Sequence, residues 1–308
     1  MSSFKHLAVF IRRILALVTL ASIILSLLSS CSDEKDISLE DIPAYCGEAY
    51  VEINRNVPYF TSDEITDKPF IEFSELDELR RAGVAFACLS KSLMPTEERE
   101  PIFSENPTGF YSDGVSNNNK YKFIDGYYVY NRSHLIGFQL CGENANIKNL
   151  ITGTRSMNID GMLPFENKVA DYIKRTGYHV MYRATPMFSE YDLVARGVLL
   201  EGYSVEDGGV GICFCVFVYN VEVGVIIDYY NGENKVDTTK AEESDFTKAP
   251  SYVLNTSSKK YHLPECHYAK STAEEYIQYY TYELSRFSYY HPDYSPCMSC
   301  KPHEYHRD

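Results

Sequence analysis

The chain has 308 residues, of which 44% are hydrophobic, enough for one large globular domain and a second small one. Its formal net charge is −14 at pH 7. Because residues 1–30 hold three basic residues (Lys5, Arg12, Arg13) and no acid, the remainder carries −17. So acidic a chain does not coat nucleic acid by overall attraction, and a polyanion would have to bind at a local basic region.

The first 30 residues have the pattern of an export signal. A basic head precedes an uncharged stretch over 14–28, which ends in Leu28-Ser29-Ser30-Cys31. So short an apolar core is typical of a signal peptide rather than of a membrane-spanning helix. Its tail resembles a bacterial lipobox, which implies lipidation of Cys31; ordinary secretion with an incidental cysteine is the alternative. We expect an exported protein that is lipid-anchored at the bacterial cell envelope, with residues 31–56 as tether and lead-in.

The first part of the following domain has few regular patterns. Leu76 and Leu79 with nearby acids predict a short helix over 74–82, capped by Ser74. Residues 95–120 are rich in Pro, Ser, Asn and Gly and predict loops. A turn at 125–126 precedes a β-type run over 127–130.

The second part has a clear periodicity. Phe165, Val169 and Ile173 recur at helical spacing, with Pro164 placed for a helix start and Gly177 for its end. Strand-like runs follow over 179–188, 197–203, 211–221 and 223–230. The sum predicts an α+β domain over 57–232. A polar linker over 233–250 and a separate small module over 251–302 complete the chain.

The segment Asn131-Arg132-Ser133-His134, followed by Asn149, Asn158 and Glu166, carries groups suited to phosphodiester hydrolysis. This reaction needs an activated water and a cation that neutralises the charge developing on phosphorus. A histidine activates water near neutral pH, and Mg²⁺ prefers oxygen ligands such as amide and carboxylate oxygens. With an unperturbed pKa, His134 would lose its activity as a base below about pH 6.

Residues 57–230 resemble the DNA/RNA non-specific endonuclease family, which has the ββα-metal fold, and are most similar to secreted streptococcal-type DNases. Family members carry Asp-Arg-Gly-His where this chain has residues 131–134, so Asn131 replaces an acid and Ser133 replaces a glycine. The resemblance implies an antiparallel sheet and the following roles: His134 as general base, Asn158 as ligand of Mg²⁺ or Mn²⁺, Glu166 in support of the metal's water shell, Asn149 orienting His134 or that shell, and Arg132 on phosphate.

The function expected from these features is a Mg²⁺-dependent, largely sequence-non-specific endonuclease acting on extracellular DNA, with RNA left open. Residues 120–183 hold nine Lys or Arg and five acids, a local charge of +4 where an anionic substrate would bind. No aromatic platform for base stacking is evident, which favours recognition of the backbone. The alternatives are a non-catalytic DNA-binding surface lipoprotein of the same fold and a hydrolase of another phosphodiester.

The C-terminal module contains His262 and Cys266 and, thirty residues on, Cys297 and Cys300. Such paired ligands can bind Zn²⁺ in a tetrahedron, with His267 as a rival to His262, and a disulfide-tied tail is the alternative. The stretch resembles the metal-binding domain of Ada-type DNA repair proteins. A structural or DNA-contacting role is expected for it, without methyl-transfer chemistry.

Overall fold

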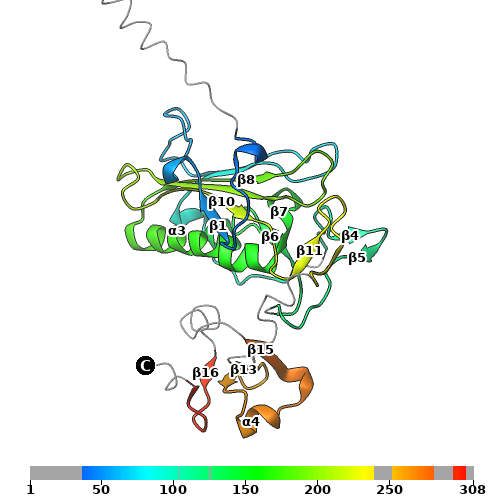
Figure 1. The fold of residues 1–308 in the computed structure, drawn as a ribbon. Coiled ribbons are helices and arrows are strands. Elements are labelled where there is room, and N and C mark those ends of the chain that lie inside the picture. The colour runs from blue at the N-terminus through cyan, green and yellow to red at the C-terminus, as the bar shows by residue number, and fades with distance from the viewer. Residues whose placement is uncertain (1–36, 103, 125, 239–251, 281–293, 303–308) are drawn as a thin grey trace, which may run out of the picture. The chain divides into compact units, whose positions relative to one another are not determined.

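The computed structural model describes residues 37–302, apart from 103, 125, 239–251 and 281–293 (Figure 1). The expected signal peptide over 1–30 and the lipidation site Cys31 lie outside the described residues. Within them, every helix is too short or too polar to cross a membrane. Residues 1–41 form a separate unit, of which the described part contains the 3₁₀ turn η1 (Leu39–Asp41).

The main domain is built on a six-stranded sheet in which every neighbouring pair is antiparallel. This arrangement confirms the predicted α+β class and antiparallel sheet, and three of its strands were expected from the sequence. In sheet order the strands are β1 (Tyr50–Glu52), β10 (Cys213–Tyr219), β9 (Gly197–Ser204), β8 (Val180–Met187), β3 (Ala85–Leu89) and β2 (Phe70–Phe73).

Helix α3 (Leu163–Thr176) lies along one face of this sheet (Figure 1). Val169 and Ile173 are fully buried in the core that it shares with the sheet. Pro164 lies in its first turn, and Gly177 ends it with a φ of 73°, a conformation that glycine adopts without steric cost. Both ends of the helix were therefore predicted correctly.

A second, two-stranded sheet leads into this helix. It consists of β6 (Tyr130–His134) and β7 (Leu150–Thr154), whose register pairs His134 with Leu150. The connection between the strands contains α2 (Phe138–Cys141) and the 3₁₀ turn η4 (Ile147–Asn149). After β7 a single π-helical segment, η5 (Met157–Met162), runs directly into α3. Two strands and a helix thus form a ββα unit.

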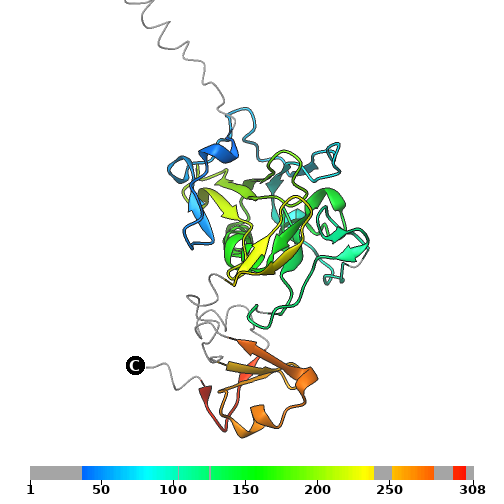
Figure 2. The ribbon, with the colours of Figure 1, turned by 45° about the vertical axis from the view of Figure 1, so that its right-hand side comes forward.

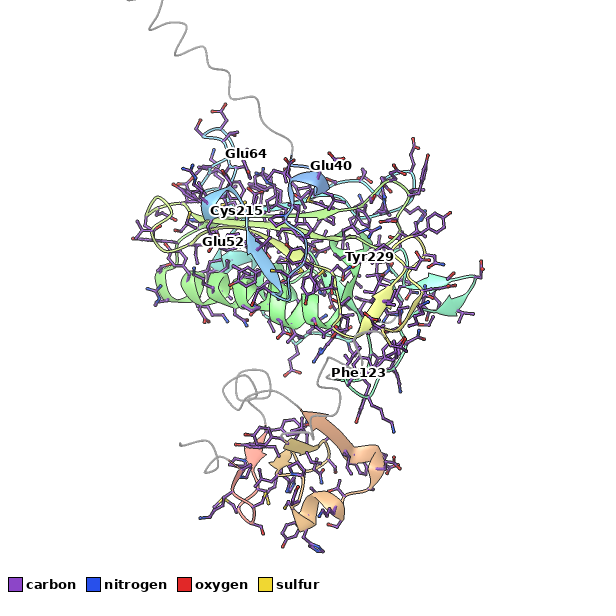
Figure 3. The ribbon with its side chains drawn as sticks, in the orientation of Figure 1. Glu40, Glu52, Glu64, Phe123, Cys215 and Tyr229 are labelled. Carbon is purple, nitrogen blue, oxygen red and sulfur yellow. The ribbon has the colours of Figure 1, made fainter. Side chains whose placement is uncertain are left out.

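On the face of the main sheet away from α3, Arg183 forms ion pairs with two glutamates and stacks on an aromatic ring. Arg183 on β8 contacts the buried Glu201 at 2.7 Å and Glu64 at 2.8 Å. Its guanidinium lies over the ring of Phe60 at 4.8 Å. Glu64 is labelled in Figure 3, on the side of the sheet opposite α3. The chain before β2 therefore covers this face.

Several shorter elements complete the domain. They are η2 (Asn54–Asn56), η3 (Lys91–Leu93), β4 (Tyr111–Ser112), β5 (Val115–Ser116), β11 (Val225–Ile227) and β12 (Asn234–Val236). β1 pairs with β10, and β12 pairs with β11. The domain therefore begins before residue 57 and continues beyond residue 232, the two boundaries expected from the sequence.

The predicted helix over 74–82 is wrong. The Asp77 side chain instead accepts hydrogen bonds from the backbone N–H groups of Leu79 and Arg81, at 3.0 and 2.8 Å. Arg80 between them adopts a φ of 64°, which no right-handed helix allows. The hydrogen bonds to the Asp77 side chain thus take the place of the backbone hydrogen bonds that a helix would form.

The C-terminal module, described by itself, has a small four-stranded sheet (Figure 2). Its order is β15 (Ile277–Tyr280), β13 (Tyr252–Asn255), β14 (Lys260–His262) and β16 (Ser295–Pro296). Helix α4 (His267–Lys270) and the 3₁₀ turn η6 (Glu274–Tyr276) connect β14 to β15. The buried Tyr252, Leu254 and Tyr261 form its core.

Candidate active site

A cleft of about 1160 Å³ lies over the ββα unit and contains most of the residues expected to act. His134, Asn158 and Glu166 all line it, although 32 positions separate the first from the last. Asn131 and Arg132 line it as well. The predicted residues are thus gathered in one cleft, with the exception of Asn149.

His134 is the last residue of β6 and is 6% exposed. Its Nε2 lies 2.8 Å from the carbonyl oxygen of Asn144. Because a carbonyl only accepts, Nε2 carries the proton and Nδ1 carries the electron pair. This electron pair accepts a long hydrogen bond from Nη2 of Arg99, at 3.5 Å. The neutral imidazole is therefore held as one tautomer, with Nδ1 as its basic atom.

The environment of this ring opposes its protonation. Burial lowers the pKa of His134 to about 4, and the positive charge of Arg99 acts in the same direction. The hydrogen bond to Asn144 favours the charged form but does not offset burial. The unperturbed pKa assumed from the sequence is thus wrong for this site, and the imidazole stays neutral well below pH 6.

Asn158 and Glu166 face the cleft together because of the π segment. In a regular α-helix of about 3.6 residues per turn, positions eight apart lie roughly 80° apart around the axis. A π turn holds an extra residue and reduces this offset. Asn158 is half-buried, and its side chain makes no hydrogen bond to another described residue. Its amide oxygen is available to a ligand.

Glu166 is 8% exposed in the first turn of α3. Burial raises the pKa of its carboxyl to about 7, against the opposing effects of Arg99 and Gln139. The carboxylate packs on Gly137, where a Cβ atom would come within 2.4 Å of Oε2. A glycine at 137 is therefore required for this position of the carboxylate.

Three arginines, Arg99, Arg132 and Arg155, line the cleft and give it positive charge. Arg132 donates from Nε to the carbonyl of Glu105 and from Nη2 to Oδ1 of Asn106, both at 2.7 Å. Its guanidinium also stacks over the ring of Phe110 at 4.4 Å. Arg99 was not predicted, since nothing in its charged surroundings relates it to His134, 35 positions away.

Asn149 lies behind the cleft rather than in it. The residue is fully buried, and its side chain pairs with the backbone of Ile136, accepting at 2.9 Å and donating at 3.0 Å. No other bond of this side chain is present in the described part of the chain. It holds the backbone two residues beyond His134, so the orienting role implied by the family resemblance is indirect in this structure.

The two departures from the family motif have different surroundings. Ser133 is fully buried against Gly153 of β7, where a Cβ atom would lie 2.3 Å from the serine Oγ. The chain thus has a side chain at 133, where the family has glycine, and a glycine at 153, where it leaves room for that side chain. Asn131 lines the cleft, and its Nδ2 is buried without a hydrogen-bond partner among the described residues.

Glu222, which was not predicted, anchors the segment that carries Asn158. Its buried carboxylate accepts from the backbone N and the Oγ of Ser156, at 2.8 and 2.7 Å. Next to it, the Asn220 side chain accepts from Thr154 N at 2.8 Å. The end of β7 and the start of η5 are therefore fixed to the loop after β10.

In the C-terminal module, His262, Cys266, Cys297 and Cys300 form one cluster whose ligand atoms all lie within 4.8 Å of one another. His267, the alternative ligand, is exposed outside this cluster. Burial, and then Lys260, lower the pKa of His262, so its imidazole is neutral, as a metal ligand must be. No two cysteines in the described ranges are bridged in this structure.

Comparisons with known proteins agree with this geometry. Residues 60–205 match the sequence profile described as DNA/RNA non-specific endonuclease. The structure of NucA from Streptococcus agalactiae with magnesium bound is 21% identical, with a TM-score of 0.55 over 65% of this chain and 94% of that chain. The structure of Sda1 nuclease with a bound zinc ion is 28% identical, with a TM-score of 0.54 over 66% of this chain and 100% of that one. Among curated proteins no match was found.

The matched residues include β6, β7, η5 and α3, which hold His134, Asn158 and Glu166 in one cleft. Both solved structures share the mixed fold with its antiparallel sheet. Residues 60–205 therefore form a DNA/RNA non-specific endonuclease domain, the domain of a hydrolytic nuclease.

Proposed function

We propose that the protein is a Mg²⁺-dependent, largely sequence-non-specific endonuclease that hydrolyses extracellular DNA, and the experiment below decides whether RNA is also a substrate. The observation that carries the proposal is that His134, held with its electron pair on Nδ1, lines the same cleft as Asn158 and Glu166. Cleavage of plasmid DNA and of RNA by residues 32–308, with Mg²⁺ and with EDTA, tests it. DNA binding without cleavage would support the alternative, a non-catalytic surface lipoprotein.

The donors in the cleft fit a hard divalent cation. Asn158 offers an amide oxygen that has no partner among the described side chains, and Glu166 offers a buried carboxylate. Both are oxygen ligands of the kind that Mg²⁺ and Mn²⁺ prefer, and thiols are absent from the residues lining the cleft. A bound cation would neutralise the charge that develops on the phosphate.

The chain's own residues supply the rest of the reaction. Nδ1 of His134 takes a proton from the water that attacks phosphorus, and the Asn144 carbonyl stabilises the resulting imidazolium through Nε2. Arg132, fixed by Glu105 and Asn106, directs its remaining donors to phosphate oxygens. The bond from phosphorus to the 3′ oxygen breaks, and this oxygen takes a proton from solvent water while the proton on Nδ1 returns to solvent. The products are a 5′-phosphate and a 3′-hydroxyl.

Glu222 acts in this scheme by positioning Asn158. Replacing Glu222 with alanine should raise the Mg²⁺ concentration for half-maximal activity about tenfold, because Ser156 loses both of its bonds at the start of η5. Glu222→Gln, which keeps an acceptor, should recover most of the loss. Glu206→Gln, which alters a carboxylate bonded to His179 outside the cleft, is the control. An unchanged Mg²⁺ dependence in Glu222→Ala would refute the positioning role.

We further propose that the C-terminal cluster binds a structural Zn²⁺ ion. One histidine and three cysteines are a common donor set of structural zinc sites. Metal analysis of the purified protein should find zinc, and Cys297→Ser with Cys300→Ser should remove about one ion per chain. Cys213→Ser, a half-buried thiol on β10, should retain it. Zinc content equal in the two variants would contradict the assignment.

Export and lipid anchoring remain proposals that rest on residues 1–31. A nuclease anchored through a lipidated Cys31 would act on nucleic acid outside the cytoplasm, joined to its lipid by the residues that precede β1. Expression in a bacterial host should place the wild type in the membrane fraction and Cys31→Ser in the soluble or precursor fraction. Equal distribution of both proteins would favour ordinary secretion.

A further inference from the structure

The catalytic cleft continues into a wall of tyrosine rings. Tyr111 on β4 and Tyr128 just before β6 both line the same cleft as His134. The two residues are 44% and 43% exposed, so they do not fill the core. We call Tyr111 and Tyr128 the tyrosine wall.

This wall is continuous with the arginine assigned to phosphate. The Arg132 guanidinium lies over the ring of Phe110 at 4.4 Å, and the rings of Phe110 and Tyr111 are 5.9 Å apart. A nucleotide whose phosphate lies at Arg132 therefore has its base near aromatic rings. The other ring of the wall carries a positive charge, since Nζ of Lys120 lies 4.7 Å from the centroid of Tyr128.

Half-exposed rings next to cations are the elements by which proteins bind unpaired nucleic acid. Each base presents a π face that stacks on an aromatic ring whatever its identity, and nearby lysines hold the backbone. In a duplex these faces are already stacked on neighbouring bases, and exposing one costs a few kcal/mol. A stacking wall therefore favours single-stranded over double-stranded nucleic acid without reading the base sequence.

We propose that the tyrosine wall is a base-stacking subsite for an unpaired nucleotide next to the scissile phosphate. The substrate class is single-stranded or locally unpaired nucleic acid, and this inference rests on the proposed nuclease function. The sequence did not reveal the wall because its two tyrosines are 17 positions apart and belong to different segments, Tyr111 to β4 and Tyr128 to the chain before β6. The proposal adds base stacking to the recognition of the backbone that the sequence favoured.

The test uses end-labelled single-stranded oligonucleotides with one abasic position, cleaved under single-hit conditions. For the wild type, the abasic position should reduce cleavage at an adjacent bond about tenfold, the loss expected from one stacked base. For Tyr111→Ala with Tyr128→Ala, all bonds should be cleaved slowly and the abasic position should have no effect. The preference for single strand over a hairpin duplex of the same sequence should fall in parallel. Tyr178→Ala, equally exposed at 43% outside the cleft, is the control.

Binding of the same oligonucleotides in EDTA, followed by fluorescence anisotropy, separates this proposal from the nuclease function. The wild type should bind the intact strand about tenfold more tightly than the abasic strand, and the double variant should bind both alike. This result is expected even if no strand is cleaved, in which case the proposed function alone fails. An abasic effect that persists in the double variant, or is absent from the wild type, overturns the subsite.

Discussion

Replacement of His134 by alanine is expected to lower kcat/KM for DNA cleavage by about 10²–10⁴-fold, the usual contribution of a positioned general base. Nδ1 of His134 is the atom that would take the proton, because Nε2 is engaged by Asn144. Steady-state kinetics on a defined oligonucleotide measures the loss. The change also leaves the Asn144 carbonyl without its donor, at a cost of about 1–3 kcal/mol, so thermal unfolding is followed for each protein.

His179→Ala is the matched control for this variant. His179 likewise bonds a neighbour, the carboxylate of Glu206, but lies on the connection between α3 and β8, outside the cleft. Its removal should leave kcat/KM unchanged. Activity of a folded His134→Ala protein within about tenfold of wild type would exclude His134 as the base.

The pH dependence separates His134 from Glu166. His134, with a pKa of about 4, stays in its neutral, active form as the pH falls from 7 to 5. Glu166, with a pKa raised to about 7 by burial, gains a proton over the same range and loses the charge that attracts a cation. Activity at low Mg²⁺ should therefore fall on acidification, and higher Mg²⁺ should move that fall to lower pH, since the cation favours the ionised carboxylate. A loss of activity near pH 6 that does not depend on the Mg²⁺ concentration would contradict this assignment.

Replacement of Asn158 by alanine is expected to lower activity at limiting Mg²⁺ by more than about a hundredfold, because removing a direct ligand should exceed the effect of removing its support. The side chain makes no other described bond, so folding should be unaffected. Activity is measured as a function of Mg²⁺, with Mg²⁺-dependent thermal stabilisation as a second readout. In wild type both should respond to the cation, and in the variant both responses should shift to higher concentration.

Asn158→Asp and Asn146→Ala serve as comparisons. Aspartate keeps an oxygen at position 158 and should retain a response to Mg²⁺, whereas alanine removes it. Asn146 caps η4 through a bond to Lys148 N and does not line the cleft, so its removal should leave the Mg²⁺ dependence alone. A folded Asn158→Ala protein with the Mg²⁺ dependence of wild type would show that the cation binds elsewhere.

The sequence by itself determined several local elements and the candidate groups that the structure gathers in one cleft. Helix α3 was predicted with both ends because a helix that packs on a sheet shows its apolar spacing, its proline and its terminal glycine within one short segment. The residues His134, Asn158 and Glu166 were identified for a similar reason, since a fixed order and spacing along the chain carried the family resemblance. The four zinc-ligand candidates followed from two short paired motifs, which the structure brings into one cluster.

Only the tertiary structure decided what depends on contacts between distant segments. Arg99, Glu222 and the tyrosine wall were missed because their partners lie far away in sequence, where no local pattern records them. The lowered pKa of His134 has the same origin, since its first cause is the burial of the ring by the surrounding residues. The helix expected over 74–82 failed because the Asp77 side chain bonded to the backbone more favourably than a short, weakly packed helix would have done. The periodicity of the sequence indicates which face of a helix or strand is buried. Which atoms meet across a cleft depends on how distant segments pack, and no local pattern indicates this.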